Sequence, residues 1–437
     1  MEPETSPIRN AREADATDAP TTRATHSSAN SAEVEAPNAE LALLTRLRRD
    51  LHRIPELGFA LPKTTAYIKG VLEALDCTVI EPCESTVCAF FDFGADETVA
   101  IRADMDALPV AEQTGVEFAS RHPGQMHACG HDGHMAMALA LANSVAEAAS
   151  LGRTLPRNVL LVFQPAEETT GGAKTVCESG VFERFNTTRI FGYHLWPDLP
   201  AGAVASRPGA LLARASETTL TVQGKSSHIA KHEQGCDALL AAARFTCAVN
   251  DLMARLREQE PCLLKFGRME SGTVRNAISA HSVVEGSLRV FSDSMFEQAK
   301  LEVEHCAQEA CESCGCTYDL HFAEGYPPVI NDARLFAEAA EVLLGDNGDK
   351  GKSGNEGKYS NDEASSAPGE PIAAGLSELA EPLLIAEDFA FYQQHLPGLF
   401  MLLGTGTGIP LHADTFNFDE RVRLRGLQVY RRLIGLE

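Results

Sequence analysis

The sequence predicts an α/β protein, in which one domain has a largely parallel central sheet flanked by helices and a second, inserted domain is α+β and ferredoxin-like. Two observations support this class. Nearly continuous apolar runs alternate with helical patterns over residues 41–210, which is typical of strands buried in a parallel sheet. Residues 211–324 follow the order strand, helix, strand, strand, helix, strand, which is the split βαβ plan.

The elements of the first domain are short and strongly apolar. In chain order they are the strand 98–104, the helix 133–149, and the strands 158–163, 189–195 and 399–404. This alternation of apolar strands and helices resumes only after the inserted domain, so residues 41–210 and 325–437 are predicted to form one domain in two parts. Side chains that follow such strands are expected to gather at one edge of the sheet.

The inserted domain is predicted from patterns of a different period. Its elements are the strand 218–223, the helix 237–258, the strands 262–269 and 282–291, the helix 294–313 and the strand 317–323. In strand 282–291, Val284, Leu288 and Val290 share one face while Glu285 and Arg289 share the other. This alternation is expected of a strand that is buried on one side only.

Two segments lack the large apolar residues that a core requires. Residues 1–40 are rich in Ala, Thr, Ser, Pro and Glu, and we predict a disordered tail. The Gly- and Asp-rich stretch 345–371 is predicted to be a mobile insertion at the surface.

Composition restricts the partners and the location that we expect. The chain has 437 residues, 44% of them hydrophobic, and a formal net charge of −24, which argues against nucleic acid or an anionic membrane as a partner. It contains neither a membrane-spanning apolar run nor the apolar core of a secretory signal. The 12 cysteines are scattered, as reduced thiols are. We therefore expect a cytoplasmic protein.

Side chains that can bind metal ions follow the ends of the predicted strands. They are Asp104, Asp106, Glu167, Glu168, His194 and His412, and "MHACGHDGHM" (126–135) adds Cys129, His131 and His134. Thiolate, imidazole and carboxylate together suit borderline divalent ions such as Zn²⁺ or Mn²⁺. More than four candidate ligands suggest a two-metal site, which activates water and polarises a carbonyl group. Neighbours in an extended segment point opposite ways, so one of the adjacent glutamates can bind metal while the other moves a proton.

Each of these residues also has a simpler interpretation. Adjacent glutamates are commonly a solvated pair, His134 can cap or pack at the start of a helix, and Cys129 can be a small buried apolar side chain. A second enzyme class would make Cys129 a nucleophile with His131 as its base. A third interpretation is a non-catalytic metal-binding protein. The joint placement at strand ends favours the metal site.

Several long motifs resemble the M20 metallopeptidase family. They are "RRDLHRIPELGF" (48–59), "IRADMDALPVAEQTG" (101–115), "MHACGHDGHM", "LVFQPAEETTGGAKTVCESGVFE" (161–183), "GYHLWPDLPAG" (192–202), "AEDFAFY" (386–392) and "PLHADTFNFDE" (410–420). They are most similar to its amidohydrolase branch, which contains N-acyl-L-amino acid amidohydrolases, hippurate hydrolases and IAA-amino acid hydrolases. The resemblance implies a binuclear-metal hydrolase in which the inserted domain is a dimerisation or lid domain.

The resemblance also implies roles for individual residues. The implied metal ligands are Cys129, His131, Glu168, His194 and His412. Glu167 would be the general base and then the acid, and Asp106 would orient a ligand. Other branches of the family have a histidine where this chain has Asp104, so Asp104 is not expected to be a ligand.

In the inserted domain, "GKSSHIAKHEQGCD" (224–237) resembles the segment whose histidine, here His228, stabilises the oxyanion in the partner subunit's active site. Asn276 and Arg289 match positions that hold the substrate, and a guanidinium suits a free carboxylate. Two prolines usual in this domain are replaced by His232 and Ser279, which leaves the substrate range more open than the chemistry.

We therefore expect a homodimeric hydrolase with two divalent ions per subunit, Mn²⁺ or Zn²⁺, that cleaves N-acyl amino acids. A dipeptidase or an aminoacylase-like peptidase is the alternative within the same family.

Overall fold

The computed structural model describes residues 32–169, 171–344 and 375–437. All the sheets described below lie within one compact unit, Glu40–Glu437. The predicted insertion and most of the predicted tail lie outside the described residues. The first helix, α1 (Ala32–His52), begins before the predicted boundary at residue 41, and residues 32–40 contain three Ala and three Glu, which are strong helix formers.

The larger sheet has eight strands, and its centre is parallel. In spatial order the strands are β1 (Thr78–Ile80), β2 (Val87–Phe91), β4 (Asn158–Gln164), β3 (Thr98–Asp104), β5 (Thr187–Trp196), β14 (Gly398–Gly404), β6 (Val204–Ser206) and β13 (Leu376–Glu378). The four central strands β4, β3, β5 and β14 pair in parallel, whereas β1, β2 and β6 each make antiparallel pairs. Every residue of β3, β4 and β14 is buried, as the apolar runs indicate. The predicted α/β class is confirmed.

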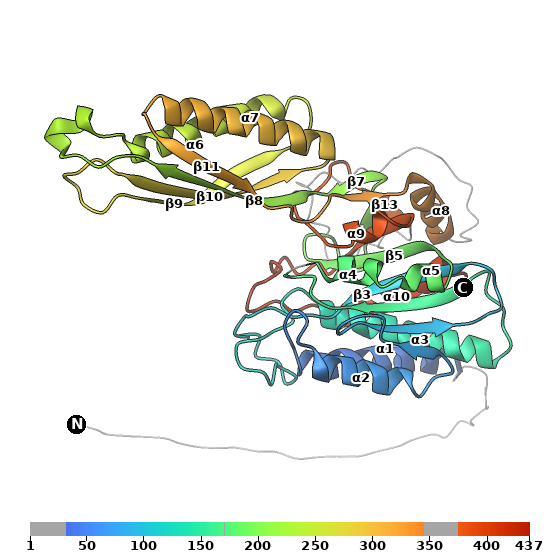
Figure 1. The fold of residues 1–437 in the computed structure, drawn as a ribbon. Helices are drawn as coiled ribbons and strands as arrows, with labels where there is room; N and C mark the ends of the chain where they lie inside the picture. The colour runs from blue at the N-terminus through green and yellow to red at the C-terminus, as the bar shows by residue number, and fades with distance from the viewer. Residues whose placement is uncertain (1–31, 170, 345–374) are drawn as a thin grey trace, which may run out of the picture. The chain divides into compact units, whose positions relative to one another are not determined.

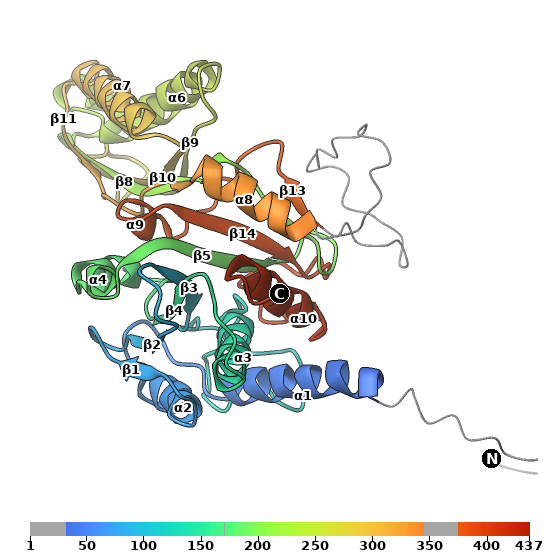
Figure 2. The same ribbon diagram turned by 90° about the vertical axis from the view of Figure 1, so that its right-hand side faces the viewer.

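Helices cover both faces of this sheet (Figures 1 and 2). On one face lie α1, α2 (Pro62–Leu72), α3 (His131–Ser150), α8 (Ala333–Leu344) and α10 (Val422–Leu433). On the other lie α4 (Gly172–Glu178), α5 (Val181–Arg184) and α9 (Ala390–Gln393). Strand β14 shows the division, because Leu399, Met401 and Leu403 pack into the first core while Phe400 and Leu402 pack into the second.

The second sheet has the ferredoxin-like plan that the sequence predicts. Its elements are β8 (Arg214–Gln223), α6 (Ala238–Leu256), β9 (Leu263–Ser271), β10 (His281–Val290), α7 (Asp293–Glu312) and β11 (Thr317–Phe322). The strands pair antiparallel in the order β11-β8-β10-β9, and α6 and α7 lie together on one face (Figure 1). Val284, Leu288 and Val290 pack against these helices, as the alternation in the sequence indicates. The predicted limits of this domain, residues 211 and 324, stay a prediction.

The chain enters and leaves the ferredoxin-like part through two segments that touch. Ala215, near the start of β8, pairs with Tyr326 in an antiparallel bridge. Gly325 has φ +58°, and a Cβ at this position would lie 1.6 Å from the carbonyl oxygen of Ala215. Only glycine allows this close approach. A short two-stranded sheet, β7 (Gly209–Leu212) with β12 (Val329–Asn331), lies beside the crossing. None of the helices in the described part of the chain is long and apolar enough to span a membrane.

Candidate metal centre and active site

The turn before α3 carries Cys129 and His131 and is held by two glycines. Gly130 has φ +87°, a conformation that favours glycine. A Cβ on Gly133 would lie 2.8 Å from the Leu195 side chain and 2.9 Å from that of Phe418. The absence of side chains at these positions lets the turn approach the end of β5, so that His131 becomes the first residue of α3.

Cys129, His131 and His194 form the first group of metal-competent side chains. Cys129 Sγ lies 3.2 Å from His194 Nε2. The Nδ1 atoms of His131 and His194 face the backbone carbonyls of Asp106 and Leu195 at 2.8 and 2.7 Å, and because a carbonyl only accepts, both Nδ1 atoms carry the proton. The Nε2 lone pairs are therefore free to bind a cation. His131 Nε2 is buried and makes no hydrogen bond to any described residue.

Cys129, Glu168 and His412 form the second group. His412 Nε2 lies 3.3 Å from Cys129 Sγ and 3.4 Å from Glu168 Oε1, an oxygen that is buried and makes no hydrogen bond within the described part of the chain. The backbone N–H of His412 donates to the carbonyl of Ala128 at 2.9 Å, which ties this loop to the cysteine turn. His412 has φ +67°, a strained value for a residue with a side chain, and such strain is common at functional sites.

The two groups share Cys129, and within each group the ligand atoms lie within 4.8 Å of one another. The two overlapping groups place five donor side chains around Cys129, and a thiolate can bind two cations at once. The donors are sulfur, imidazole nitrogen and carboxylate oxygen, the set that borderline divalent ions prefer. His131 Nε2 and Glu168 Oε1, which are buried and make no hydrogen bond to any described residue, are the kind of atoms that a bound cation would satisfy. The residues therefore fit a pair of divalent ions.

Glu167 lies beside these groups on a tightly held turn. The backbone of this turn is constrained at three residues. Ala166 has φ +57°, and the amides of Glu167 and Glu168 donate to Asp106 Oδ1 and Oδ2 at 2.9 and 3.1 Å. Burial, and then the nearby carboxyls of Glu387 and Glu168, raise the pKa of Glu167 well above its usual range. A carboxyl with a raised pKa is suited to take up and release a proton near neutral pH.

Asp104 and His134 are occupied by each other and by neighbouring groups. His134 Nε2 accepts a hydrogen bond of 2.9 Å from the backbone N–H of Leu195, so its Nδ1 is the atom that donates to Asp104 Oδ1 at 2.6 Å. The other oxygen of Asp104 accepts from Arg102 Nη1 at 2.6 Å. His131 Nε2 lies 3.4 Å from the same oxygen. The geometry favours a packing role for His134, one of its two interpretations from the sequence.

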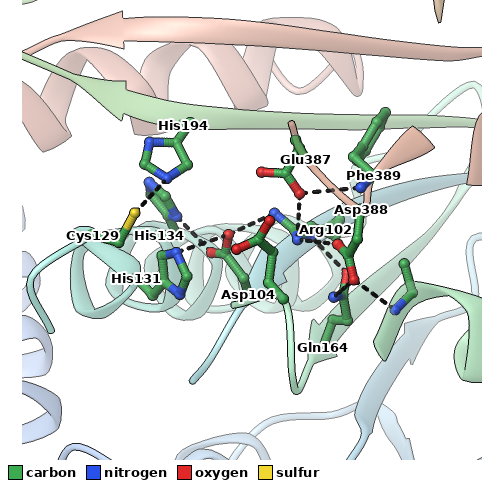
Figure 3. A network of polar contacts seen from close by, with 12 residues as sticks. Arg102, Asp104, Cys129, His131, His134, Gln164, His194, Glu387, Asp388 and Phe389 are labelled. Atoms are coloured by element: carbon green, nitrogen blue, oxygen red, sulfur yellow. Dashed lines mark hydrogen bonds and ion pairs between the residues drawn. The ribbon is translucent and has the colours of Figure 1, made fainter. Parts of the chain in front are cut away.

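Arg102 is at the centre of a buried polar network (Figure 3). Its guanidinium donates to Asp104, to Glu387 Oε1 at 2.9 Å, to Asp388 Oδ1 at 2.9 Å and to Gln164 Oε1 at 2.8 Å. This network joins the ends of β3 and β4 to the segment before α9. Of these residues only Asp104 was considered from the sequence, although the adjacent acids of "AEDFAFY" were a signal for Glu387 and Asp388.

A second buried network supports the cysteine turn from α1. Asp132, the second residue of α3, accepts from Arg48 Nε at 3.0 Å and pairs with His52 Nδ1 at 2.8 Å. The guanidinium of Arg48 also lies 3.7 Å from the centroid of the Phe418 ring. The motif "RRDLHRIPELGF" therefore contributes by holding the neighbour of His131 in place.

A cavity of about 1140 Å³ opens beside the metal-competent groups. Its wall includes Cys129, Glu167, Glu168, His194 and His412 on one side and Glu217, Lys265, Arg268, Glu285 and Arg289 of the ferredoxin-like sheet on another. Tyr326, Leu384 and Ile385 contribute as well. Arg289 is thus brought to the same cavity as the metal groups.

His228 and Asn276 are not part of this wall. Both are exposed, and they lie near each other because the amide of Ile229 donates to the carbonyl of Asn276 at 3.1 Å and His228 pairs with Ala277 in a bridge. Among the predicted site residues, the structure therefore gathers Asp106, the general-base candidate, the five candidate ligands and Arg289, but leaves this pair elsewhere.

Metal-competent groups at the carboxyl ends of a parallel sheet, beside a buried carboxyl and a large cavity, define a metal-dependent hydrolase. Comparison with known proteins agrees. Residues 100–435 match the Peptidase family M20/M25/M40, and the chain belongs to this family. An uncharacterized hydrolase of Staphylococcus haemolyticus is 32% identical over 405 residues, which cover 91% of this chain and 98% of that protein.

Two solved structures are also similar. A proposed aminohydrolase from methicillin-resistant Staphylococcus aureus has a TM-score of 0.79 and 28% identity, over 92% of this chain and 97% of its own. The Bacillus subtilis YXEP protein, described as a dinuclear metal-binding peptidase of the M20 family, has a TM-score of 0.74 and 28% identity, over 91% of this chain and 98% of its own. The predicted family and the predicted enzyme class are confirmed.

Proposed function

We propose that this protein is a two-metal amidohydrolase that cleaves N-acyl amino acids into a carboxylic acid and a free amino acid. The observation that carries the proposal is the pair of ligand groups that share Cys129, next to the buried carboxyl of Glu167, in a cavity that Arg289 also lines. The proposed ligands are Cys129, His131, His194, Glu168 and His412. Divalent ions bound there, Mn²⁺ or Zn²⁺, would supply a Lewis acid for the scissile carbonyl and lower the pKa of water.

Glu167 is the proposed proton carrier. It takes a proton from the attacking water and delivers it to the nitrogen of the departing amino acid. Asp106 supports this role, because its carboxylate binds the amides of Glu167 and Glu168 and its carbonyl accepts from His131. One residue thus orients the proton carrier and two of the proposed ligands.

Arg289 is the proposed anchor for the carboxylate of the amino acid. It lies on β10 and lines the cavity, and a guanidinium can bind a carboxylate through two parallel hydrogen bonds. Leu384 and Ile385 are large apolar side chains that line the same cavity while 42% and 46% exposed, which suits an apolar acyl group.

A homodimer completes the proposal. Strand β9 is an edge of its sheet, and Ile229, Met269 and Val274 are exposed near its end, at 48%, 40% and 58%. Unpaired edges and exposed apolar side chains favour association. His228 and Asn276, which do not line the cavity of their own chain, would act in the partner's cavity, where the imidazole would stabilise the oxyanion. A cytoplasmic location is still our prediction from the sequence.

A dipeptidase is the second candidate. Glu217 and Glu285 line the cavity, and a carboxylate there could accept the free ammonium group that a dipeptide has and an N-acyl amino acid lacks. The two candidates share the chemistry and differ in the group on the scissile carbonyl.

The test is the release of free amino acid from a panel of N-acyl amino acids and matched dipeptides. Metal-stripped protein is assayed with and without Mn²⁺ or Zn²⁺, and Glu167→Gln is the inactive control. We expect metal-dependent release from N-acyl substrates, with turnover of the control lower by about 10²- to 10⁴-fold at unchanged metal content. Faster cleavage of dipeptides would favour the second candidate, and no release from either class would refute both.

A further inference from the structure

Tyr326 connects the segment that returns from the ferredoxin-like sheet to the turn that bears Glu167. Its hydroxyl donates a hydrogen bond of 2.6 Å to the backbone carbonyl of Glu167. Burial, and then the carboxyls of Asp388 and Glu167, raise the pKa of the phenol, so the hydroxyl keeps its proton and acts as a donor. Nothing in the proposed mechanism uses this contact.

The carbonyl that Tyr326 binds belongs to the peptide unit between Glu167 and Glu168. The N–H of the same unit donates to Asp106 Oδ2 at 3.1 Å. The peptide is therefore held at both of its polar ends, by a phenol on one side and by a carboxylate on the other. Since a peptide unit is planar, holding its two ends fixes the orientation of its plane and so restricts ψ of Glu167 and φ of Glu168, two of the rotations that set the direction of the flanking side chains.

The turn needs this support because it is strained. Ala166 has φ +57°, and its carbonyl accepts from the amides of Gly171 and Gly172, both at 3.1 Å. A non-glycine residue in the left-handed region is strained and persists only where its surroundings hold it. Removing one restraint lets the peptide rotate toward a relaxed conformation.

Tyr326 is itself placed by rigid neighbours. The preceding Gly325 contacts the backbone of Ala215 so closely that no side chain fits, and Ala215 pairs with Tyr326. The ring packs edge-on against Phe391, with centroids 6.0 Å apart, and against Gly171, where a Cβ would lie 3.0 Å from the ring. The hydroxyl of Tyr326 thus connects the segment that joins the two sheets to the backbone of Glu167, the proposed proton carrier.

We propose that Tyr326 is a positioning residue that fixes the Glu167–Glu168 peptide, and so aims the Glu167 carboxyl at the attacking water. The inference rests on the proposed function of Glu167. Tyr326 acts through the backbone, because its hydroxyl is committed to the carbonyl of Glu167. The contact also links the orientation of the ferredoxin-like part to the chemistry, since the residue lies where the chain returns from it.

The test is Tyr326→Phe, which removes the hydroxyl and keeps the ring. We expect kcat for the best substrate of the panel to fall about five- to tenfold, the effect of one ordinary hydrogen bond, with KM within about twofold and metal content unchanged. Tyr318→Phe is the matched control, because its hydroxyl donates to Glu304 at 2.7 Å on the surface, and we expect its kcat to match that of the parent protein. A kcat for Tyr326→Phe within about twofold of the parent value would overturn the inference.

Hydrogen exchange of the peptide that contains residues 166–172 gives a readout that does not depend on turnover. We expect faster exchange in Tyr326→Phe and unchanged exchange in Tyr318→Phe. A fall in kcat without faster exchange would overturn the backbone route. If the parent protein cleaves no substrate, the proposed function fails, and exchange alone still decides whether Tyr326 holds this turn.

Discussion

Replacing Cys129 with serine removes the ligand that the two proposed metal positions share. Its Sγ lies 3.2 Å from His194 Nε2 and 3.3 Å from His412 Nε2, which belong to different groups. If Cys129 bound only one ion, its loss would weaken the binding of that ion alone. The shared position predicts that both ions are weakened together.

The size of the effect follows from the number of ligands. Structural zinc sites with four protein ligands bind with about 10 to 16 kcal/mol, or about 2.5 to 4 kcal/mol per ligand. At about 1.4 kcal/mol per factor of ten, the loss of one ligand raises the Kd by about 10²- to 10³-fold. Cys129→Ser is therefore expected to raise both dissociation constants by about this factor.

The assay is calorimetric titration of metal-stripped protein with Zn²⁺, together with elemental analysis after dialysis. Cys177→Ser, which changes a buried cysteine of α4, is the matched control and should bind as the parent protein does. Two ions bound by Cys129→Ser at parental affinity would refute the assignment of Cys129 as a ligand. Weakening of one ion alone would refute the shared position.

Three further predictions concern the cavity and the support of the cysteine turn. Arg289→Lys should raise KM for carboxylate-bearing substrates about tenfold or more with kcat less affected, because a lysine cannot bind a carboxylate bidentately; equal KM would remove Arg289 from substrate binding. Arg48→Met should lower the free energy of unfolding by about 3 kcal/mol or more in urea titrations, because it leaves the buried Asp132 with less compensation, whereas Arg53→Met, at a partly exposed side chain, should cost less than about 1 kcal/mol. Burial lowers the pKa of His52, but the Asp132 carboxylate and the hydrogen bonds of His52 raise it by more, so that the pKa is about 9 instead of the ordinary 6.5. Because the pKa of His52 is higher in the folded than in the unfolded protein, protonated His52 contributes fully to the free energy of unfolding below about pH 6.5, and this contribution is lost as pH rises through about 9. The difference in free energy of unfolding between the parent protein and His52→Gln should therefore shrink over that range. A difference that grows with pH would contradict this prediction.

Much of the fold was predictable because its strands are either wholly buried or buried on one face. The predicted strand 98–104 coincides with β3, and the alternation of Val284, Leu288 and Val290 correctly gave the buried face of β10. Local hydrophobic patterns of this kind indicate how long a strand is and which of its faces is buried. Glu168 and His194 lie close together for a related reason, since both lie at the carboxyl ends of parallel strands.

The supporting networks were not predictable from local patterns. Arg102 stands inside an apolar strand, and its partners Glu387 and Asp388 lie 285 and 286 residues away in the chain. No periodicity indicates which acids such a buried arginine meets. Tyr326 is similar, because its partner is a backbone carbonyl, an atom that every residue has. His134 is the reverse case. A histidine in this motif looks like a metal ligand in the sequence, and only its two hydrogen bonds in the structure favour a packing role.

The most direct test of the account is the activity of metal-stripped protein as Zn²⁺ or Mn²⁺ is added in known equivalents per chain. If two ions held by groups that share Cys129 are needed for amide hydrolysis, release of amino acid should be absent without metal and should reach its plateau at two equivalents. Full activity of the stripped protein, or a plateau at one equivalent, would contradict the two-metal mechanism.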